Sequence, residues 1–332
     1  MKSAILGLVA VSLVMSPVQA RDYRAEQDAV AARVAPEIWD VYEPRTGTYN
    51  PSNAYLCAHA VQTVARHGHE ESMAGNFFDQ VVEIDGGDGL PRVVVAAGEK
   101  MVLAVFDPPP HRSIAKMWKF LQLGLTDSAE WLGGGGRIHS GGAKGIDAIW
   151  DDFHAQLAAV HGRNQPVWLA GHGLGGSLAV LAAYRLVADE GIPIQGVYTF
   201  GQPRVGDSGF AAAFEEALEV FDDGGPLYRV VYRNDIVPRL TPPYVATTRL
   251  VTDTLSPYVH FGALMFIASE GGVEANPGRL ESLDASLFEL KDRRNHEMGM
   301  YQRFLYDALD EQLRAQLPKP VGLRRGKRIL EN

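Results

Sequence analysis

The chain is poor in cysteine, in positive charge and in long hydrophobic segments. Its 332 residues include a single cysteine, Cys57, which excludes an intramolecular disulfide framework. The formal net charge of -9 argues against a nucleic-acid partner. Beyond the N-terminal stretch, no segment reaches the roughly 20 apolar residues that a membrane span needs. A hydrophobic core must therefore hold the protein together, and Cys57 is expected to be a small buried member of it.

The first twenty residues have the pattern of a secretory signal peptide. Lys2 precedes an apolar run over residues 4–15, and residues 18–20 end the segment with a small side chain. A retained membrane anchor is the alternative, which the shortness of the run disfavours. We therefore expect an exported protein, in a periplasm or outside the cell, with a signal peptide over residues 1–20. One domain would follow over 21–317, and a basic tail over 318–332.

Strand and helix patterns alternate along the chain. Residues 91–95 and 101–106 flank a Gly-Glu turn and are predicted to form paired strands. Apolar residues from Ile146 to Val160 recur at steps of three and four, which predicts one helix with an apolar stripe. Further strands are expected at 197–200 and 228–232. This alternation predicts an α/β fold with a largely parallel central sheet and helices on both faces.

Residues 167–176 read V-W-L-A-G-H-G-L-G-G, which is the pattern of a nucleophile elbow. In the G-x-S-x-G elbow, a sharp turn between a strand and a helix lifts a serine hydroxyl above the sheet. Here the nucleophile position holds Gly173. Glycine keeps the turn, relaxes its unfavourable backbone angles and removes the attacking oxygen.

With this elbow, the chain resembles the class 3 lipase family, α/β-hydrolases of the fungal triacylglycerol lipase type whose elbow commonly reads G-H-S-L-G-G. Residues 198–207, Y-T-F-G-Q-P-R-V-G-D, are similar to a strand and loop of that family, and 137–141 to the start of the helix before the elbow. Residues 233–240 contain N-D-I-V-P-R-L, whose aspartate, Asp235, is at the position that orients the family's catalytic histidine. The resemblance covers roughly residues 93–305 and implies the α/β-hydrolase fold.

Two histidines follow Asp235 and are candidates for the catalytic base. His296 matches the family's late D-x-x-x-H pattern, whereas His260 lies in an apolar, strand-like run. We favour His296, which gives the order Gly173, Asp235, His296. A histidine held by an aspartate takes a proton from a serine or from a positioned water, but glycine has no side-chain proton to give.

The oxyanion loop departs from the family as well. Where the family has F-R-G-T or F-R-G-S, this chain reads F-D-P-P-P over residues 106–110. A proline at the donor position has neither a backbone N–H nor a hydroxyl. The backbone N–H of Leu174 is the remaining candidate donor. Because both the nucleophile and the loop differ, natural loss of the serine mechanism is favoured over a single engineered change.

Residues 111–125 occupy the place of the family's mobile lid. Polar residues at every third position leave a broad apolar face, which suits either a helix over an apolar groove or an ordinary surface helix. The candidate lid and substrate-binding residues are Ile114, Met117, Trp118 and Leu121.

Two other polar residues are assigned structural roles. His139 precedes a predicted helix, and Ser177 is expected about one turn into the helix after the elbow, where a small residue allows close packing.

The sequence therefore predicts a class 3 lipase-like protein of lipid metabolism. The resemblance implies a carboxylic-ester or triacylglycerol hydrolase, which we expect to be weakly active or inactive because Gly173 replaces the serine and prolines replace the oxyanion loop. The alternative is a non-catalytic lipid- or acyl-binding protein. The expected partner is a lipid or ester substrate, with transient contact with a lipid interface, and the expected state is a monomer. The sequence has no H-E-x-x-H motif, clustered cysteines or phosphate-binding loop, so no metal or organic cofactor is expected.

Overall fold

The computed structural model of the chain describes residues 36–65, 73, 78–87, 89–108, 125–127, 135–162, 165–218, 226–233, 235, 237–239, 258–268, 272–277, 293–317 and 319–320. The signal peptide predicted over 1–20, the four lid residues and most of the basic tail lie outside these residues. Within them, no helix is both long and apolar enough to cross a membrane.

Eight of the described strands form one sheet in the order β1-β2-β3-β6-β7-β8-β9-β10. Their bounds are β1 Gln80–Asp85, β2 Arg92–Ala97, β3 Val102–Asp107, β6 Val167–His172, β7 Gly196–Phe200, β8 Leu227–Tyr232, β9 Ala263–Ile267 and β10 Val273–Ala275. The five strands from β3 to β9 are mutually parallel, and antiparallel partners flank them on both sides. The predicted pairing of the two strands around the Gly-Glu turn is confirmed by the register of β2 against β3. A separate two-stranded sheet pairs β4 Leu125–Asp127 with β5 Arg137–His139.

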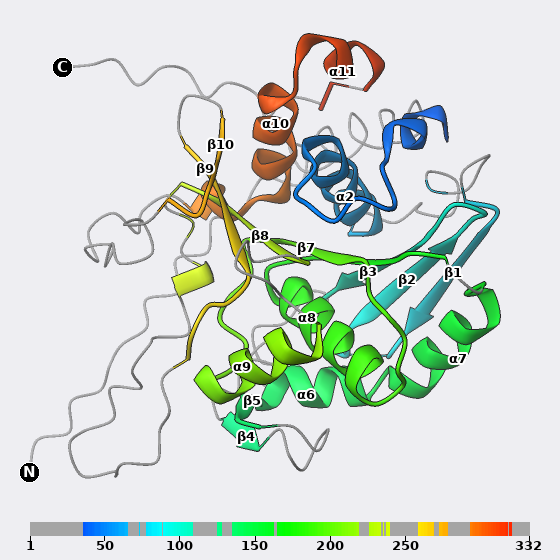
Figure 1. The fold of residues 1–332 in the computed structure, drawn as a ribbon, viewed down its shortest axis with the longest axis vertical. Helices are drawn as coiled ribbons and strands as arrows, with labels where there is room; N and C mark the ends of the chain where they lie inside the picture. The colour runs from blue at the N-terminus through cyan, green and yellow to red at the C-terminus, as the bar shows by residue number, and fades with distance from the viewer. Residues whose placement is uncertain are drawn as a thin grey trace, which may run out of the picture.

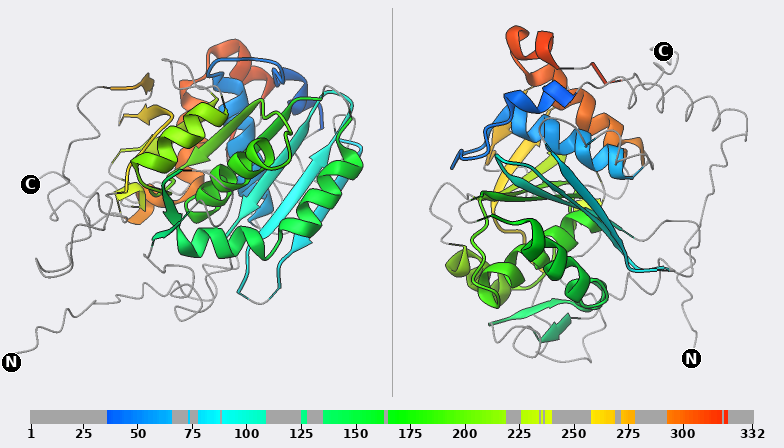
Figure 2. Two further views of the ribbon diagram at one scale, coloured as in Figure 1. Left: turned by 60° about the horizontal axis from the view of Figure 1, so that its bottom comes forward. Right: turned by 90° about the vertical axis from the view of Figure 1, so that its right-hand side faces the viewer.

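Helices cover both faces of the large sheet (Figure 1). One layer contains η1 Pro36–Val41, α2 Pro51–Val64, α10 Met298–Ala308 and α11 Glu311–Gln316. The other contains α6 Ser140–Asp147, α7 Trp150–Val160, α8 Leu174–Ala188 and α9 Ser208–Ala217. In the right-hand view of Figure 2 these two layers lie on opposite sides of the strands. The predicted α/β-hydrolase architecture, largely parallel and covered on both faces, is confirmed.

The sheet divides the core into two clusters. Along β2, Val94 and Ala96 belong to the cluster under α2 and α10, whereas Val93 and Val95 belong to the cluster under α6, α7 and α8. Alternate side chains of a strand point to opposite faces, so a strand covered on both sides must be apolar throughout. This explains the uninterrupted hydrophobic runs in the sequence. Cys57 is fully buried in α2, as predicted.

The single helix predicted from the apolar stripe between Ile146 and Val160 is wrong, because the stripe is shared by two helices. The N–H of Ile149 bonds to the carbonyl of Ile146, a tight turn that ends α6, and α7 begins at Trp150. Ile146, Ile149 and Trp150 are nevertheless all buried. Periodicity therefore identified the buried face but not the break, because a tight turn keeps that face toward the sheet.

Candidate functional site

Gly173 forms the turn between β6 and α8. Its backbone angles, φ 54° and ψ -122°, are those of the first central position of a type II′ turn, where glycine is strongly favoured. The N–H of Gly173 donates to the carbonyl of Phe200 in β7 (2.8 Å), and its own carbonyl accepts from the N–H of Ser177 (3.3 Å). The strand-to-helix elbow is therefore present, fixed to the neighbouring strand and closed by the first turn of the helix.

The space beside Gly173 is occupied by the ring of His296. A Cβ atom placed on Gly173 would lie 2.9 Å from His296 Nε2 and 3.1 Å from Cε1. Unstrained heavy atoms pack about 3.5 Å apart. The histidine thus lies against the elbow at the position where a nucleophile's side chain would begin.

Asp235, His296 and Tyr301 form a hydrogen-bonded cluster beside the elbow. Asp235 follows the end of β8 and is fully buried. Its Oδ2 lies 2.8 Å from His296 Nδ1 and accepts a hydrogen bond from the Tyr301 hydroxyl at 2.5 Å, while Oδ1 accepts from the N–H of Val237 at 2.9 Å. Because Nδ1 faces the carboxylate, Nε2 is the ring nitrogen that faces Gly173.

Tyr301 connects this cluster to the sheet and to α10. Its hydroxyl donates to Asp235 and accepts from the N–H of Tyr232 at the end of β8 (3.2 Å). Burial and the neighbouring carboxylate raise the pKa of Tyr301 well above its ordinary value, so the hydroxyl stays protonated and remains a donor. Sequence reasoning did not identify Tyr301, although an aromatic hydroxyl in the helix directly after His296 was the available signal.

His172 was also not assigned a role from the sequence. Its ring stacks on that of His296, with centroids 4.2 Å apart, and meets Tyr301 edge-on. The histidine immediately before the nucleophile position was the signal that could have found it. The stacked ring restricts the tilt of His296, so it helps to keep Nε2 over the elbow.

Gly201 leaves room for the Asp235–His296 pair. It has a positive φ of 60°, and a Cβ there would lie 2.5 Å from Asp235 Oδ2, 2.8 Å from the Tyr301 hydroxyl and 3.0 Å from His296 Nδ1. A side chain at this position would separate the carboxylate from both of its partners. The glycine at the end of β7 is therefore part of the site.

The oxyanion side of the elbow is formed by the start of α8 and the end of β3. Leu174 is the first residue of α8, where backbone N–H groups have no carbonyl within the helix to bond to. Pro108 lies beside the same turn, since a Cβ on Gly175 would be 3.1 Å from Pro108 Cδ. Asp107 forms an ion pair with Arg92 of β2 (2.8 Å), which holds the end of β3. Pro109 and Pro110 lie outside the described residues.

The structure brings His296, and not His260, to Asp235. His260 Nε2 lies 3.0 Å from the carbonyl of Pro238, and burial together with Arg229 and Arg204 lowers the pKa of His260 well below its ordinary value.

His139 and Ser177 occupy positions inside the fold. His139 Nδ1 caps α6 by accepting from the N–H of Gly142 (3.1 Å), and Ser177 is buried one turn into α8. Within the described part of the chain, no cluster of three or more potential ligands could hold a metal ion.

Comparison with known proteins supports the resemblance to the class 3 lipases. The model of the class 3 lipases matches residues 111–245. A segment of 105 residues is 43% identical to triacylglycerol lipase OBL1 of Arabidopsis thaliana, covering 30% of this chain and 18% of that protein. Another of 79 residues is 43% identical to secreted mono- and diacylglycerol lipase 2 of Gibberella zeae, covering 23% and 19%. The chain thus matches about a fifth of the length of each of these two relatives.

Solved structures show the same fold at low sequence identity. Lipase II of Rhizopus niveus is 20% identical and aligns over 75% of this chain and 95% of its own, with a TM-score of 0.52. Triacylglyceride lipase of Rhizomucor miehei is 20% identical and aligns over 73% and 89%, with a TM-score of 0.51. The family match and this shared architecture agree with the elbow and with the order of the strands: the chain has the α/β-hydrolase fold, and residues 111–245 have the sequence pattern of the class 3 lipases.

Proposed function

We propose that the protein is a lipid-ester hydrolase by descent that binds acyl esters and turns them over slowly or not at all. The observation that carries this proposal is the contact between Gly173 and His296. The candidate base and its aspartate are assembled at the elbow, yet the residue they would activate has no hydroxyl. Loss of a catalytic serine lowers kcat by about 10⁶-fold in a serine hydrolase.

Any residual hydrolysis would use water as the nucleophile. His296 Nε2 would take a proton from water as the water oxygen attacks the ester carbonyl. The resulting oxyanion would be held by the N–H of Leu174, and its collapse would expel an alkoxide that takes the proton back from Nε2. The products are one acid and one alcohol. Because the sequence has prolines at 108–110, where the family's second oxyanion donor is expected, this route lacks a stabilising contact worth roughly 10²–10³ in rate.

The relatives support a lipid or carboxylic ester as the ligand class. One is named as a triacylglycerol lipase and another as a secreted mono- and diacylglycerol lipase. We propose that this chain too is exported, that it contacts a lipid interface transiently, and that it acts as a monomer. The alternative function is lipid or acyl binding without hydrolysis. The absence of a nucleophile at Gly173 supports this alternative as well.

Four proteins test the proposal: the unmodified chain, Gly173→Ser, His296→Ala and the double variant. Each is assayed with short- and long-chain p-nitrophenyl esters. We expect hydrolysis near the buffer rate from the unmodified chain, a gain from Gly173→Ser, and loss of that gain in the double variant. The serine requires the His296 ring to move by about 0.6 Å to reach ordinary contact distance, so its rate is expected to stay below that of an intact lipase.

Two outcomes would contradict the proposal of slow or absent turnover. Rapid hydrolysis by the unmodified chain that His296→Ala abolishes would require an efficient water route. Rapid hydrolysis that survives His296→Ala would require a nucleophile elsewhere. No hydrolysis by any variant, together with saturable binding of a non-hydrolysable alkyl ether analogue of the ester, would favour the binding function.

A further inference from the structure

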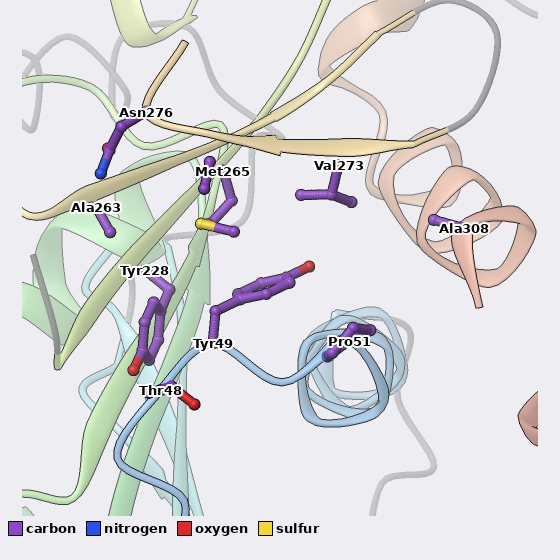
Figure 3. Close-up of a pocket in the computed structure, with 10 residues that line it drawn as sticks. Thr48, Tyr49, Pro51, Tyr228, Ala263, Met265, Val273, Asn276 and Ala308 are labelled. Carbon is purple, nitrogen blue, oxygen red and sulfur yellow. The ribbon is translucent and has the colours of Figure 1, made fainter. Parts of the chain in front are cut away.

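A pocket of about 510 Å³ lies on the α2 and α10 side of the sheet. Its floor consists of buried side chains from two parallel strands, Tyr228, Ala263 and Met265. Its walls come from the loop before α2, from β10 and from α10, through Tyr49, Val273 and Ala308 (Figure 3). The volume is within the roughly 300–1,000 Å³ typical of small-molecule sites.

The pocket is separate from the elbow. Tyr228 lies at the start of β8, whereas Asp235 follows the end of that strand. Ala308 is the last residue of α10, and His296 precedes the first. At a helical rise of 1.5 Å per residue, the length of α10 separates the two sites by about 16 Å. The pocket and the nucleophile position are therefore separate sites on the fold.

The hydroxyl of Tyr49 is buried and has no hydrogen-bond partner among the described residues. The ring is fixed by edge and tilted contacts with Tyr228 and Tyr198, at centroid distances of 5.8 and 6.1 Å. In Figure 3 it lies across the pocket with the hydroxyl directed toward the side of Val273 and Ala308. Burial raises the pKa of Tyr49 above its ordinary value, so the group is a neutral donor.

A buried donor without an acceptor costs free energy that a suitable ligand would recover. Tyr228, the other tyrosine of the pocket, already donates to the carbonyl of Gly47 (3.2 Å). Tyr49 is therefore the one of these two hydroxyls that lacks an acceptor among the described residues. Since the described lining contains no charged side chain, an ionised guest would gain no counter-ion from these residues.

We propose that this pocket binds an uncharged, largely apolar molecule with one accepting oxygen, such as a fatty alcohol or a simple ester, whose oxygen accepts a hydrogen bond from Tyr49. The proposal does not depend on the function proposed for the elbow. It requires only the cavity and the buried Tyr49 hydroxyl at its wall.

The test is calorimetric titration of the full chain with 1-octanol and with octanoate at pH 8. Octanol is expected to bind about tenfold or more tightly than the ionised acid. Tyr49→Phe, which keeps the ring, should weaken octanol binding about fivefold, as expected for one neutral hydrogen bond. Ala308→Trp should abolish it by filling the cavity. Tyr306→Phe removes a hydroxyl outside the pocket lining, so it is the matched control and should leave the octanol affinity unchanged.

Thermal unfolding provides a second readout that does not depend on calorimetric heats. Without ligand, Tyr49→Phe should raise Tm, because it removes a buried hydroxyl that has no acceptor. Octanol should raise the Tm of the unmodified chain more than that of the variant. Circular dichroism verifies that Ala308→Trp is folded.

Three results would overturn the proposal. Octanoate could bind as tightly as octanol, or Tyr49→Phe could leave both the affinity and Tm unchanged. Octanol binding could also be lost in His296→Ala while persisting in folded Ala308→Trp, which would place the alcohol near the elbow instead. Loss of hydrolysis in the elbow variants has no bearing on these titrations, so the two proposals fail independently.

Discussion

Replacing Gly173 by alanine tests whether the elbow has adapted to the absence of a side chain. The substitution adds one methyl group at a residue with φ 54° and ψ -122°. That methyl carbon would lie 2.9 Å from His296 Nε2. Two separate costs follow, one in the backbone and one in the contact with the histidine.

The backbone cost follows from the turn. A residue with a Cβ held in this sparsely populated region costs about 1–3 kcal/mol. The contact adds to it, because His296 must recede by about 0.6 Å to reach ordinary packing distance. This movement stretches its hydrogen bond to Asp235, whose loss would cost about 1 kcal/mol. We therefore expect Gly173→Ala to lower the free energy of unfolding by about 2–4 kcal/mol.

Urea unfolding followed by circular dichroism measures this change, and Gly191→Ala is its matched control. Gly191 also has a positive φ, 63°, but no atom lies within 4 Å of the position of its Cβ. Gly191→Ala should cost about 1–2 kcal/mol from the backbone alone. If Gly173→Ala were no more destabilising than Gly191→Ala, the His296 contact would carry no energetic weight and the reasoning would be wrong.

Three further substitutions have outcomes set by the structure. Tyr301→Phe removes a donor to buried Asp235 and should cost about 1–3 kcal/mol in urea unfolding, whereas Tyr306→Phe, which loses an exposed hydrogen bond, should cost clearly less. Asp207→Ala removes the cap of α9 and should cost about 1–2 kcal/mol, and Asp207→Asn should recover most of it because the accepting Oδ1 is kept. Burial lowers the pKa of His139 from its ordinary 6.5 to about 4. As the pH falls, the unfolded chain therefore protonates at His139 at a higher pH than the folded chain does. The associated stability, about 3 kcal/mol, is complete above pH 6.5 and is lost as the pH falls toward 4; His139→Asn keeps a cap acceptor and should flatten this part of the stability profile.

The elbow and the sheet could be predicted because their signals are local. A strand covered on both faces must be apolar throughout, and such runs are visible at β2, β3 and β6. The turn at Gly173 lies within a ten-residue pattern that fixes the strand, the bend and the helix together. The break between α6 and α7 was missed because Ile146, Ile149 and Trp150 keep the helical spacing across a tight turn.

The contacts of the site could be predicted only in part, because they join distant segments. Asp235 and His296 were named from family patterns, and the structure places them 2.8 Å apart. Tyr301 and His172 carry no motif of their own. Their positions follow from how α10 and β6 meet at the end of β8, and neighbouring residues in the sequence do not encode that geometry.

Asp235 could have a structural role, a role in orienting His296 as a base, or both, and the His296→Ala variant separates the two roles. A buried carboxylate is costly to desolvate, so its presence requires partners that satisfy it. Tyr301 and the N–H of Val237 already supply donors to both of its oxygens and tie β8 to α10. If that tie were its whole role, His296, whose side chain is 27% exposed, would be dispensable for stability and for any residual hydrolysis. A loss of slow hydrolysis in His296→Ala without a matching loss of stability would instead mean that the base still acts on water beside a glycine.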